Sequence, residues 1–428
     1  MHTVRRMHTV APPAVALGSV PMHRLGEAVV TVVGADDEPI ANADVTITQI
    51  RHDFAFGNTG FDVGDGEDLT GEWQLTAAEA ELWLQIHNAA TLPFYWGRFE
   101  PTRGAPRTAE MRRTAQWLRQ RGVALKGHPL VWHTVTAPWL LDLDLDEIER
   151  AQRERIRRDV ADFAGLVDTW DAINETVIMP VFDNGDNGIT RLAKDRGRLA
   201  MLRLAFDEAR ETNPNAVLLV NDFDLSPAYE RVIEEMMDAG IRPDAIGLQT
   251  HMHQGYRGED EILEVADRFA RFGLPLHFTE TTLLSGDLMP PEIDDLNDYQ
   301  VDHWPSTPEG EARQADEIER HYRSLVSHPA VEAVTYWGFS DRGMWLGAPG
   351  GLVRADGTPK PSFDALRRLI ADEWWVTPTT VRTDSVGRVT LSGFRGEYAV
   401  SVAGQPAVPL RLGRDLLAET IRVSPAGP

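Results

Sequence analysis

Short apolar runs and longer amphipathic stretches alternate along most of the chain. The apolar runs have the length and composition of buried strands, and they lie at residues 54–59, 89–96, 123–132, 167–174, 216–223, 245–251, 275–280 and 333–339. Apolar residues recur at helical spacing between them, which predicts helices at 76–87, 146–166, 191–213, 227–239, 258–272, 309–328 and 360–371. Strands that alternate with helices form a parallel sheet, and eight such units predict a closed (β/α)8 barrel, the TIM-barrel fold.

Both ends of the chain show a different pattern, in which apolar and polar residues alternate one by one. Residues 28–33 and 43–48 flank a turn-rich segment, so we predict that they pair as a β-hairpin. Short strands separated by Gly, Asp and Pro return between 379 and 412. Neither end is large enough for its own core, and we expect both to form one small accessory β-sandwich.

The predicted organisation therefore has four parts. They are a flexible N-terminal segment (1–22), N-terminal sandwich strands (23–51), the barrel (52–373) and C-terminal sandwich strands (374–428).

The composition narrows the classes of partner. The chain has 428 residues, a formal net charge of -24 at pH 7 and a pI near 4.9. This acidic excess repels phosphate groups, so we expect neither nucleic acid nor an anionic membrane as a partner, whereas a neutral sugar is compatible with it. The absence of cysteine excludes disulfides, thiolate nucleophiles and zinc–thiolate sites. Nothing in the composition indicates an oligomeric state.

The N-terminal residues bear on localisation. No apolar run reaches the roughly 18 residues that a membrane-spanning helix needs. Arg5 and Arg6 precede an apolar run at 10–18, but Pro12 and Pro13 interrupt that run, which makes it a weak signal-peptide core. We expect a cytoplasmic protein, with secretion as the alternative.

Polar and aromatic side chains gather at the carboxyl ends of six successive predicted strands. In a (β/α)8 barrel these ends meet on one rim, where active sites lie. In chain order the side chains are His128 and Trp132, Asn174 and Glu175, Asn221 and Asp222, Gln249 and His251, Glu280, and Trp337 followed by Trp345.

Glu175 and Glu280 each end an apolar run, so we expect both carboxylates to face one cavity, about 5 Å apart. Such a pair suits the cleavage of a glycosidic bond with retention of configuration. We assign Glu175 as the general acid/base and Glu280 as the nucleophile.

Neighbouring side chains fit supporting roles in this chemistry. Asn174 is placed to donate to the sugar 2-hydroxyl. We expect Gln249 and His251 to hold Glu280 in its attacking geometry and keep it ionised. Trp337 and Trp345 would supply flat walls for a pyranose ring.

These strand ends resemble glycoside hydrolase family 10, the endo-β-1,4-xylanases, over roughly residues 52–371. The matching segments are His-Pro-Leu-Val-Trp-His at 128–133, Trp-Asp-Ala-Ile-Asn-Glu at 170–175, Val-Asn-Asp-Phe at 220–223, Gly-Leu-Gln-Thr-His at 247–251, Phe-Thr-Glu at 278–280, the block at 337–345 and Pro-Lys-Pro at 359–361. The resemblance implies a (β/α)8 barrel, retaining hydrolysis of a carbohydrate substrate and no cofactor or metal. It also implies that the following residues surround the scissile sugar: His128, Trp132, Asn174, Gln249, His251, Trp337 and Trp345.

One segment departs from the family pattern. After its second strand the family carries Glu-Asn-x-Met-Lys-Trp, whose Glu, Asn and Lys bind the glycone, whereas this chain reads Thr-Leu-Pro-Phe-Tyr-Trp at 91–96. Loss of polar groups from a sugar site costs large factors in discrimination, so xylan specificity does not carry over. Tyr95 and Arg98 are candidate replacement contacts, with surface roles as the alternative.

A long acidic loop at 281–308 follows Glu280 and contains Trp304 near its end. It would narrow an open cleft into a pocket, or form a partly mobile surface excursion. With the expected localisation, the first reading favours short oligosaccharides or glycosides as substrates.

Two other classes of function stay open. A metal-dependent barrel hydrolase would use His251 and His253, which stand at strand spacing, with His128 and His133 nearby. A carbohydrate-binding protein without catalysis would need only the aromatic walls, although both glutamates are present.

Overall fold

The computed structural model describes residues 21–63, 74–402 and 405–423. The chain divides into two compact units, one of residues 55–365 and one that joins residues up to 54 with residues from 366 onward. The observed boundaries between the units are 54/55 and 365/366, whereas the predicted boundaries were 51/52 and 373/374. The predicted flexible segment 1–22 lies almost wholly outside the described residues, which open with a single 3-10 turn, η2(Met22–Arg24). Of the described helices, none is both long and apolar enough for a membrane crossing.

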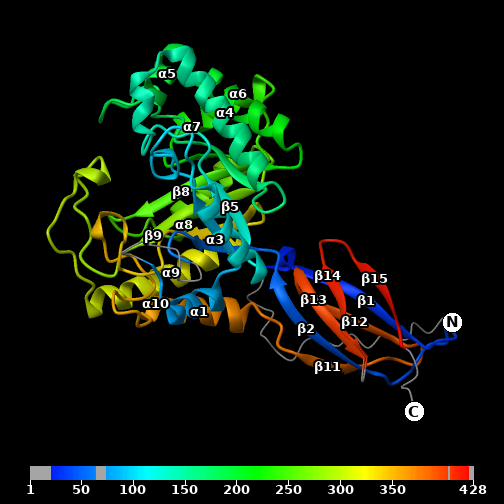
Figure 1. Ribbon diagram of the computed structural model, residues 1–428. Coiled ribbons are helices and arrows are strands. Elements are labelled where there is room, and N and C mark those ends of the chain that lie inside the picture. Colours follow the sequence, from blue (N-terminus) through cyan, green and yellow to red (C-terminus); the bar gives the residue numbers. More distant parts are fainter. Residues whose placement is uncertain (1–20, 64–73, 403–404, 424–428) are drawn as a thin grey trace. The chain divides into compact units, whose positions relative to one another are not determined.

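The larger unit is a closed barrel of parallel strands surrounded by helices (Figure 1). Its strands are β3(Ala55–Thr59), β4(Ala89–Pro93), β5(Ala124–His128), β6(Thr169–Asn174), β7(Val217–Asp222), β8(Ala245–Met252), β9(Leu276–Leu283) and β10(Val331–Tyr336). Each pairs in parallel with the next in sequence, and β10 pairs with β3 to close the ring. The predicted (β/α)8 barrel is confirmed.

The helices of this unit follow the amphipathic stretches of the sequence. They are α1(Ala77–Ile86), α2(Trp96–Phe99), α3(Thr108–Gln120), α4(Leu145–Phe163), α5(Gly188–Arg196), α6(Arg198–Thr212), α7(Pro227–Asp238), α8(Glu259–Ala270), α9(Pro308–Ser327) and α10(Pro361–Arg367), with shorter 3-10 turns η3(Pro138–Asp142), η4(Leu296–Asp298) and η5(Trp345–Gly347). The stretch predicted as one helix at 191–213 is two helices, because Gly197 between them has a φ of 85° and ends α5.

Two barrel strands are shorter than predicted, and proline is the reason. The runs at 89–96 and 123–132 stop pairing at Pro93 and His128, where Pro129 follows. Proline has no N–H to continue the ladder. The residues beyond, including Tyr95 and Trp132, are thereby released onto the barrel rim. β9 is longer than predicted and carries Glu280 inside the strand.

A close contact between β5 and β6 sets the position of the rim beside His128. Gly127 lies against the indole of Trp170, which is fully buried; a Cβ at Gly127 would stand 2.2 Å from the ring. Only glycine admits the large side chain there, so the Gly-His pair in β5 and the Trp-Asp pair in β6 form one packing unit.

The smaller unit is a β-sandwich built from both ends of the chain, as predicted. One sheet has the order β12(Arg388–Phe394), β1(Leu25–Val33), β15(Leu417–Arg422). The other has the order β11(Thr379–Arg382), β2(Asp44–His52), β13(Gly396–Val402), β14(Val408–Leu412), and a short π-helical turn, η6(Arg368–Glu373), precedes β11. One apolar cluster joins residues of the two sheets, among them Val30, Leu391, Val45 and Val400.

The predicted β-hairpin is wrong, because β1 and β2 belong to different sheets. β1 pairs with β12 and β15, and β2 pairs with β11 and β13. The connection between them is too long for a tight hairpin turn. Each strand instead buries its apolar face against the opposite sheet, and the C-terminal segment supplies the pairing partners.

Candidate active site

Glu175 follows the last residue of β6 and takes an unusual backbone conformation. Its φ is 57°, in the left-handed region that costs a non-glycine residue about 1–3 kcal/mol. Its N–H donates to the carbonyl of Asn221 at 2.8 Å, and this bond pins the turn to β7. Such strain is retained where the surrounding structure enforces it, commonly at a functional site.

The Glu175 carboxylate sits where its neutral form is favoured. Trp132 Nε1 donates to Oε2 at 2.8 Å and Asn174 Nδ2 donates to Oε1 at 3.2 Å, while 13% of the side chain stays exposed. Burial raises the pKa of Glu175 to about 8; the bond from Trp132 opposes the rise, and the negative charges of Asp222 and Glu280 add to it. Glu175 is therefore a protonated acid at neutral pH with an opening toward solvent.

Glu280 is held in the opposite state. His251 Nε2 lies 3.2 Å from Oε2, Asn221 Nδ2 donates to Oε1 at 3.0 Å, and His128 Nε2 is 4.0 Å from Oε1. Burial alone would raise the pKa of Glu280, but the bond with His251 and the electrostatic effects of His128, His251 and Lys126 outweigh it and lower that pKa. Glu280 is an ionised carboxylate beside a protonated one.

Two side-chain amides connect the glutamates. The same Nδ2 of Asn221 that contacts Glu280 also donates to Asn174 Oδ1 at 2.8 Å, and Asn174 in turn donates to Glu175. Thr279 Oγ1 donates to Asn221 Oδ1 at 2.6 Å and so fixes which end of that amide faces the carboxylate. The two predicted catalytic residues thus share one hydrogen-bonded network.

The role expected for Gln249 is wrong in one respect. Gln249 Nε2 donates to Asn174 Oδ1 at 3.0 Å, whereas we expected it to hold Glu280. Both oxygens of Glu280 already have donors in Asn221 and His251, so the Gln249 amide meets the free lone pair of Asn174. Of the two supports expected for Glu280, the structure brings His251 alone into contact with it.

Buried charges behind the rim were not singled out in the sequence. Asp171 Oδ2 lies 2.8 Å from Lys126 Nζ and 2.7 Å from His128 Nδ1, which turns Nε2 of His128 toward Glu280. Asp171, Lys126 and His128 are all buried. The available signal was one charged residue in each of two consecutive apolar runs, a Lys in β5 and an Asp in β6.

Asp222, at the end of β7, supports the turn that carries Glu175. It accepts bonds from Thr176 Oγ1 at 3.2 Å and from the backbone N–H of Val177 at 3.0 Å. Burial raises the pKa of Asp222 to about 6, so it is mostly ionised at neutral pH. It contributes both geometry and negative potential to Glu175.

Aromatic rings gather near both carboxylates. Tyr95 lies 5.6 Å from the ring of His128 and 5.4 Å from Trp132, and Trp337 lies 5.4 Å from His128. Phe61 stands edge-on to both Tyr95 and Trp337, at 5.7 and 5.4 Å. Sequence reasoning missed Phe61, which follows β3 by two residues, because only the ends of later strands were considered.

Trp345 completes the wall on the side of β8. Its ring lies 5.0 Å from His251 and 5.2 Å from His253, and Trp304 lies 6.4 Å from His253. Trp304 belongs to the long loop after β9, which packs around a small apolar cluster of its own with Leu284, Met289 and Ala348. The loop therefore forms a folded lobe that backs Trp345.

The alternative was a metal site that uses His251 and His253, and the described residues supply no set of ligands for it. Their rings are 5.9 Å apart, and the nitrogens of His251 face Thr282 and Glu280. Within the part of the chain that the structure describes, no group of three or more acidic or imidazole side chains is arranged to hold a metal ion.

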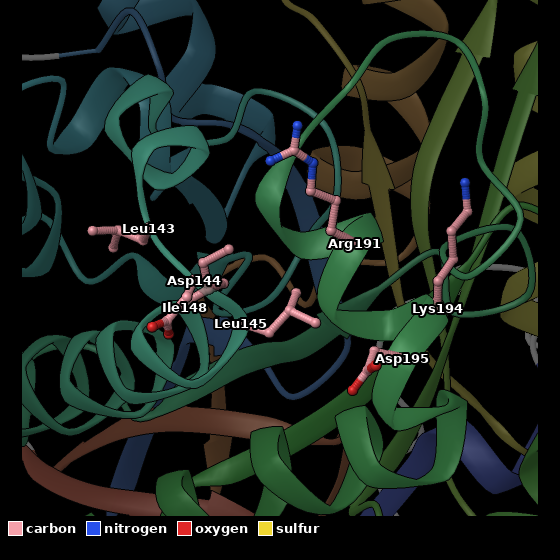
Figure 2. Close-up of a pocket in the computed structure, with 7 residues that line it drawn as sticks. All are labelled: Leu143, Asp144, Leu145, Ile148, Arg191, Lys194 and Asp195. Atoms are coloured by element: carbon pink, nitrogen blue, oxygen red, sulfur yellow. The ribbon is translucent and has the colours of Figure 1, made fainter.

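A separate hollow of about 640 Å³ lies between the start of α4 and the helix α5, and Figure 2 shows the side chains that line it. Its walls combine apolar and charged side chains and include none of the predicted site residues. The lining residues are Leu143, Asp144, Leu145, Ile148, Arg191, Lys194 and Asp195.

Comparison with known proteins gives one family model, described as glycosyl hydrolase family 10, that matches residues 87–369. An anti-sigma-I factor of Acetivibrio thermocellus is 25% identical over 380 residues, which is 87% of this chain and 44% of that protein, so the chain spans less than half of that relative. The endo-1,4-beta-xylanase B of Thermotoga neapolitana is 25% identical over 301 residues, 65% of this chain and 78% of that protein.

Solved structures share the fold. The structure of a GH10 protein from Paenibacillus barcinonensis has a TM-score of 0.59 at 22% identity and covers 74% of this chain and 94% of that one. Xylanase 10B from Thermotoga petrophila, solved in complex with xylobiose, has a TM-score of 0.58 at 21% identity, with coverage of 75% and 95%.

Proposed function

The chain belongs to glycosyl hydrolase family 10, and from this premise we propose that it hydrolyses β-glycosidic bonds with retention of configuration. Glu175 is the proposed acid/base and Glu280 the proposed nucleophile. The observation that carries the proposal is the divergence of their pKa values, raised to about 8 for Glu175 and lowered for Glu280 within one network. Paired groups with pKa values pushed apart are how a site assigns an acid and a base.

In the first step, an oxygen of Glu280 attacks the anomeric carbon. The bond between that carbon and the glycosidic oxygen breaks, its electron pair stays on the leaving oxygen, and the proton of Glu175 completes the released hydroxyl. The positive charge that develops on the sugar is favoured by the adjacent anion, whose geometry His251 and Asn221 hold.

In the second step, water displaces Glu280 from the anomeric carbon. Formation of the ester removes the negative charge of Glu280, which had raised the pKa of Glu175. The acid/base residue therefore holds its proton less tightly and becomes able to accept one from the attacking water. The carboxylate of Glu280 leaves with its electron pair, and both residues return to their starting states.

For the substrate, we propose a β-linked, xylan-related oligosaccharide or glycoside with altered recognition of the glycone. The xylanase names among the relatives support the xylan-like linkage. Phe94 and Tyr95 stand where the family pattern has Met and Lys, and the wall of Phe61, Tyr95 and Trp337 presents rings in place of charged donors. The lobe that backs Trp345 supports a preference for short substrates, which suits the cytoplasmic location that we propose.

Trapping of a covalent intermediate tests the mechanism. An activated 2-deoxy-2-fluoro β-glycoside should inactivate the enzyme in a time-dependent way and leave one sugar on the peptide that contains Glu280, seen by mass spectrometry. The Glu175→Ala variant should lose activity on poor leaving groups, and added azide should restore turnover of aryl glycosides as the β-azide. A first product of inverted configuration by NMR would refute retention.

The choice of sugar needs its own experiment. A panel of aryl β-xyloside, glucoside, galactoside, arabinoside and glucuronide, run beside xylan and xylo-oligosaccharides, should show higher kcat/KM on short substrates than on polymer. Equal turnover of polymeric xylan and xylobiose-sized substrates would contradict the proposed preference for short substrates.

A further inference from the structure

Arg98 is an exposed cation on the aromatic wall of the site. It lies in α2, and its guanidinium carbon is 5.7 Å from the centroid of the Tyr95 ring. Among the described residues no carboxylate forms an ion pair with Arg98. By contrast, Arg158 contacts Glu100 and Asp159, each at 2.8 Å.

Tyr95 connects this cation to the surroundings of the two glutamates. Its ring is buried against His128 and Trp132, and no described protein group bonds to its hydroxyl. Burial raises the pKa of Tyr95 well above its usual range; the charge of Glu280 adds to this rise more than that of Glu175 does, and Arg98 opposes it. His128 faces Glu280 and Trp132 donates to Glu175, so Tyr95 lies beside a neighbour of each glutamate.

Three other cations of the barrel unit are already paired with carboxylates. Lys126 pairs with Asp171, Arg342 with Glu79, and Lys360 with Asp341. The protein as a whole has a formal charge of -24, which repels an anionic substrate unless a local cation offsets it. The guanidinium of Arg98 offers that offset, and its planar fork matches a carboxylate.

We propose that Arg98 binds the carboxylate of a hexuronic acid in the substrate, so that the site prefers acidic oligosaccharides over neutral ones. The uronate is not the sugar that Glu280 attacks, because a carboxylate beside the ionised Glu280 would be repelled. This inference rests on the proposed function and gives Arg98 a role in specificity.

A binding experiment separates this inference from the hydrolysis itself. The full chain carrying Glu280→Gln is titrated by calorimetry with a xylo-oligosaccharide that bears glucuronic acid, and with the same oligosaccharide after reduction of its carboxyl to an alcohol. We expect the acid to bind about tenfold tighter, as one charge-assisted bond warrants, and the advantage to shrink as salt is added.

Arg98 variants in the same background identify the cation. Arg98→Ala should abolish the difference between acid and alcohol, and Arg98→Lys should retain part of it. Arg119→Ala is the matched control, since Arg119 is also exposed in the barrel unit, with no ion pair among the described residues, and lies on α3; it should leave the difference unchanged.

Two results would overturn the inference. One is equal affinity for the acid and the alcohol, including no binding of either. The other is an advantage of the acid that persists in Arg98→Ala. Failure of the proposed function would show instead in the wild-type chain, as absence of a trapped glycosyl-enzyme on neutral glycosides.

Discussion

The Nδ2 atom of Asn221 lies 3.0 Å from Oε1 of Glu280, and the same nitrogen serves Asn174 on the acid/base side. One amide therefore presents its partial positive charge to the nucleophile and holds the residue that contacts Glu175. The orientation of that amide is enforced by Thr279. A neutral donor placed in this way lowers the cost of keeping Glu280 ionised within a buried site.

Asn221→Asp should damage the site more than its small change in shape suggests. A second carboxylate next to Glu280 disfavours ionisation of both, so the acidic limb of the pH profile of kcat/KM should move to higher pH. We expect a loss of about ten- to a hundredfold in kcat/KM at pH 6, on the scale of one misplaced electrostatic contact. Asn215→Asp, on the exposed turn before β7, is the control. An unshifted acidic limb would show that Asn221 does not tune the nucleophile.

The basic limb of the same profile should report Glu175. Activity requires its proton, so kcat/KM should fall as pH rises through about 8. In Asp222→Asn, loss of the neighbouring negative charge should lower the pKa of Glu175 and move this limb to lower pH. Asp238→Asn, in which an exposed carboxylate on α7 is removed, is the comparison. A basic limb that stays in place in Asp222→Asn would assign Asp222 a purely structural role.

The raised pKa of Glu175 also has a consequence for stability. The pKa of Glu175 is about 8 in the folded state and near 4.3 in the unfolded state, so the folded state holds the proton more tightly. The stability that this proton contributes is therefore lost as the pH rises from the unfolded pKa through the folded pKa. Glu175→Gln removes this loss. Its free energy of unfolding should exceed that of the wild type by about 3–5 kcal/mol at pH 9 and by little at pH 4.

Denaturant unfolding at several pH values measures this difference. Glu154→Gln, an exposed change on α4, should show no such pH dependence. A stability gain in Glu175→Gln that is the same at pH 4 and pH 9 would mean that the wild-type carboxyl is not neutral in the folded state.

Local patterns determined much of this protein. The eight alternations of apolar run and amphipathic stretch specify eight βα units. Each unit buries its apolar face only against its neighbours, and eight such units close into the observed barrel. The two glutamates were also visible, because parallel strands deliver their carboxyl ends to one rim and a carboxylate at the end of a buried run has few structural uses.

Such local patterns did not predict which side chains of different strands contact one another. Sequence spacing did not show that Gln249 bonds to Asn174, or that Lys126 and Asp171 orient His128, because these depend on strand register and on which lone pairs are already occupied. The predicted hairpin failed for a related reason. The partners of β1 and β2 come from the C-terminal end of the chain, hundreds of residues away.

The amino-acid sequence by itself determined the fold class and marked two carboxyl groups at the ends of apolar runs, because hydrophobic periodicity is a local property and barrel geometry converts it into position. Only the tertiary structure decided their protonation states. Glu175 and Glu280 are the same residue type in one barrel, the first directly after β6 and the second within β9. Burial raises the pKa of the first, while His251, His128 and Asn221 hold the second ionised, and those environments exist only once the strands are closed into a ring.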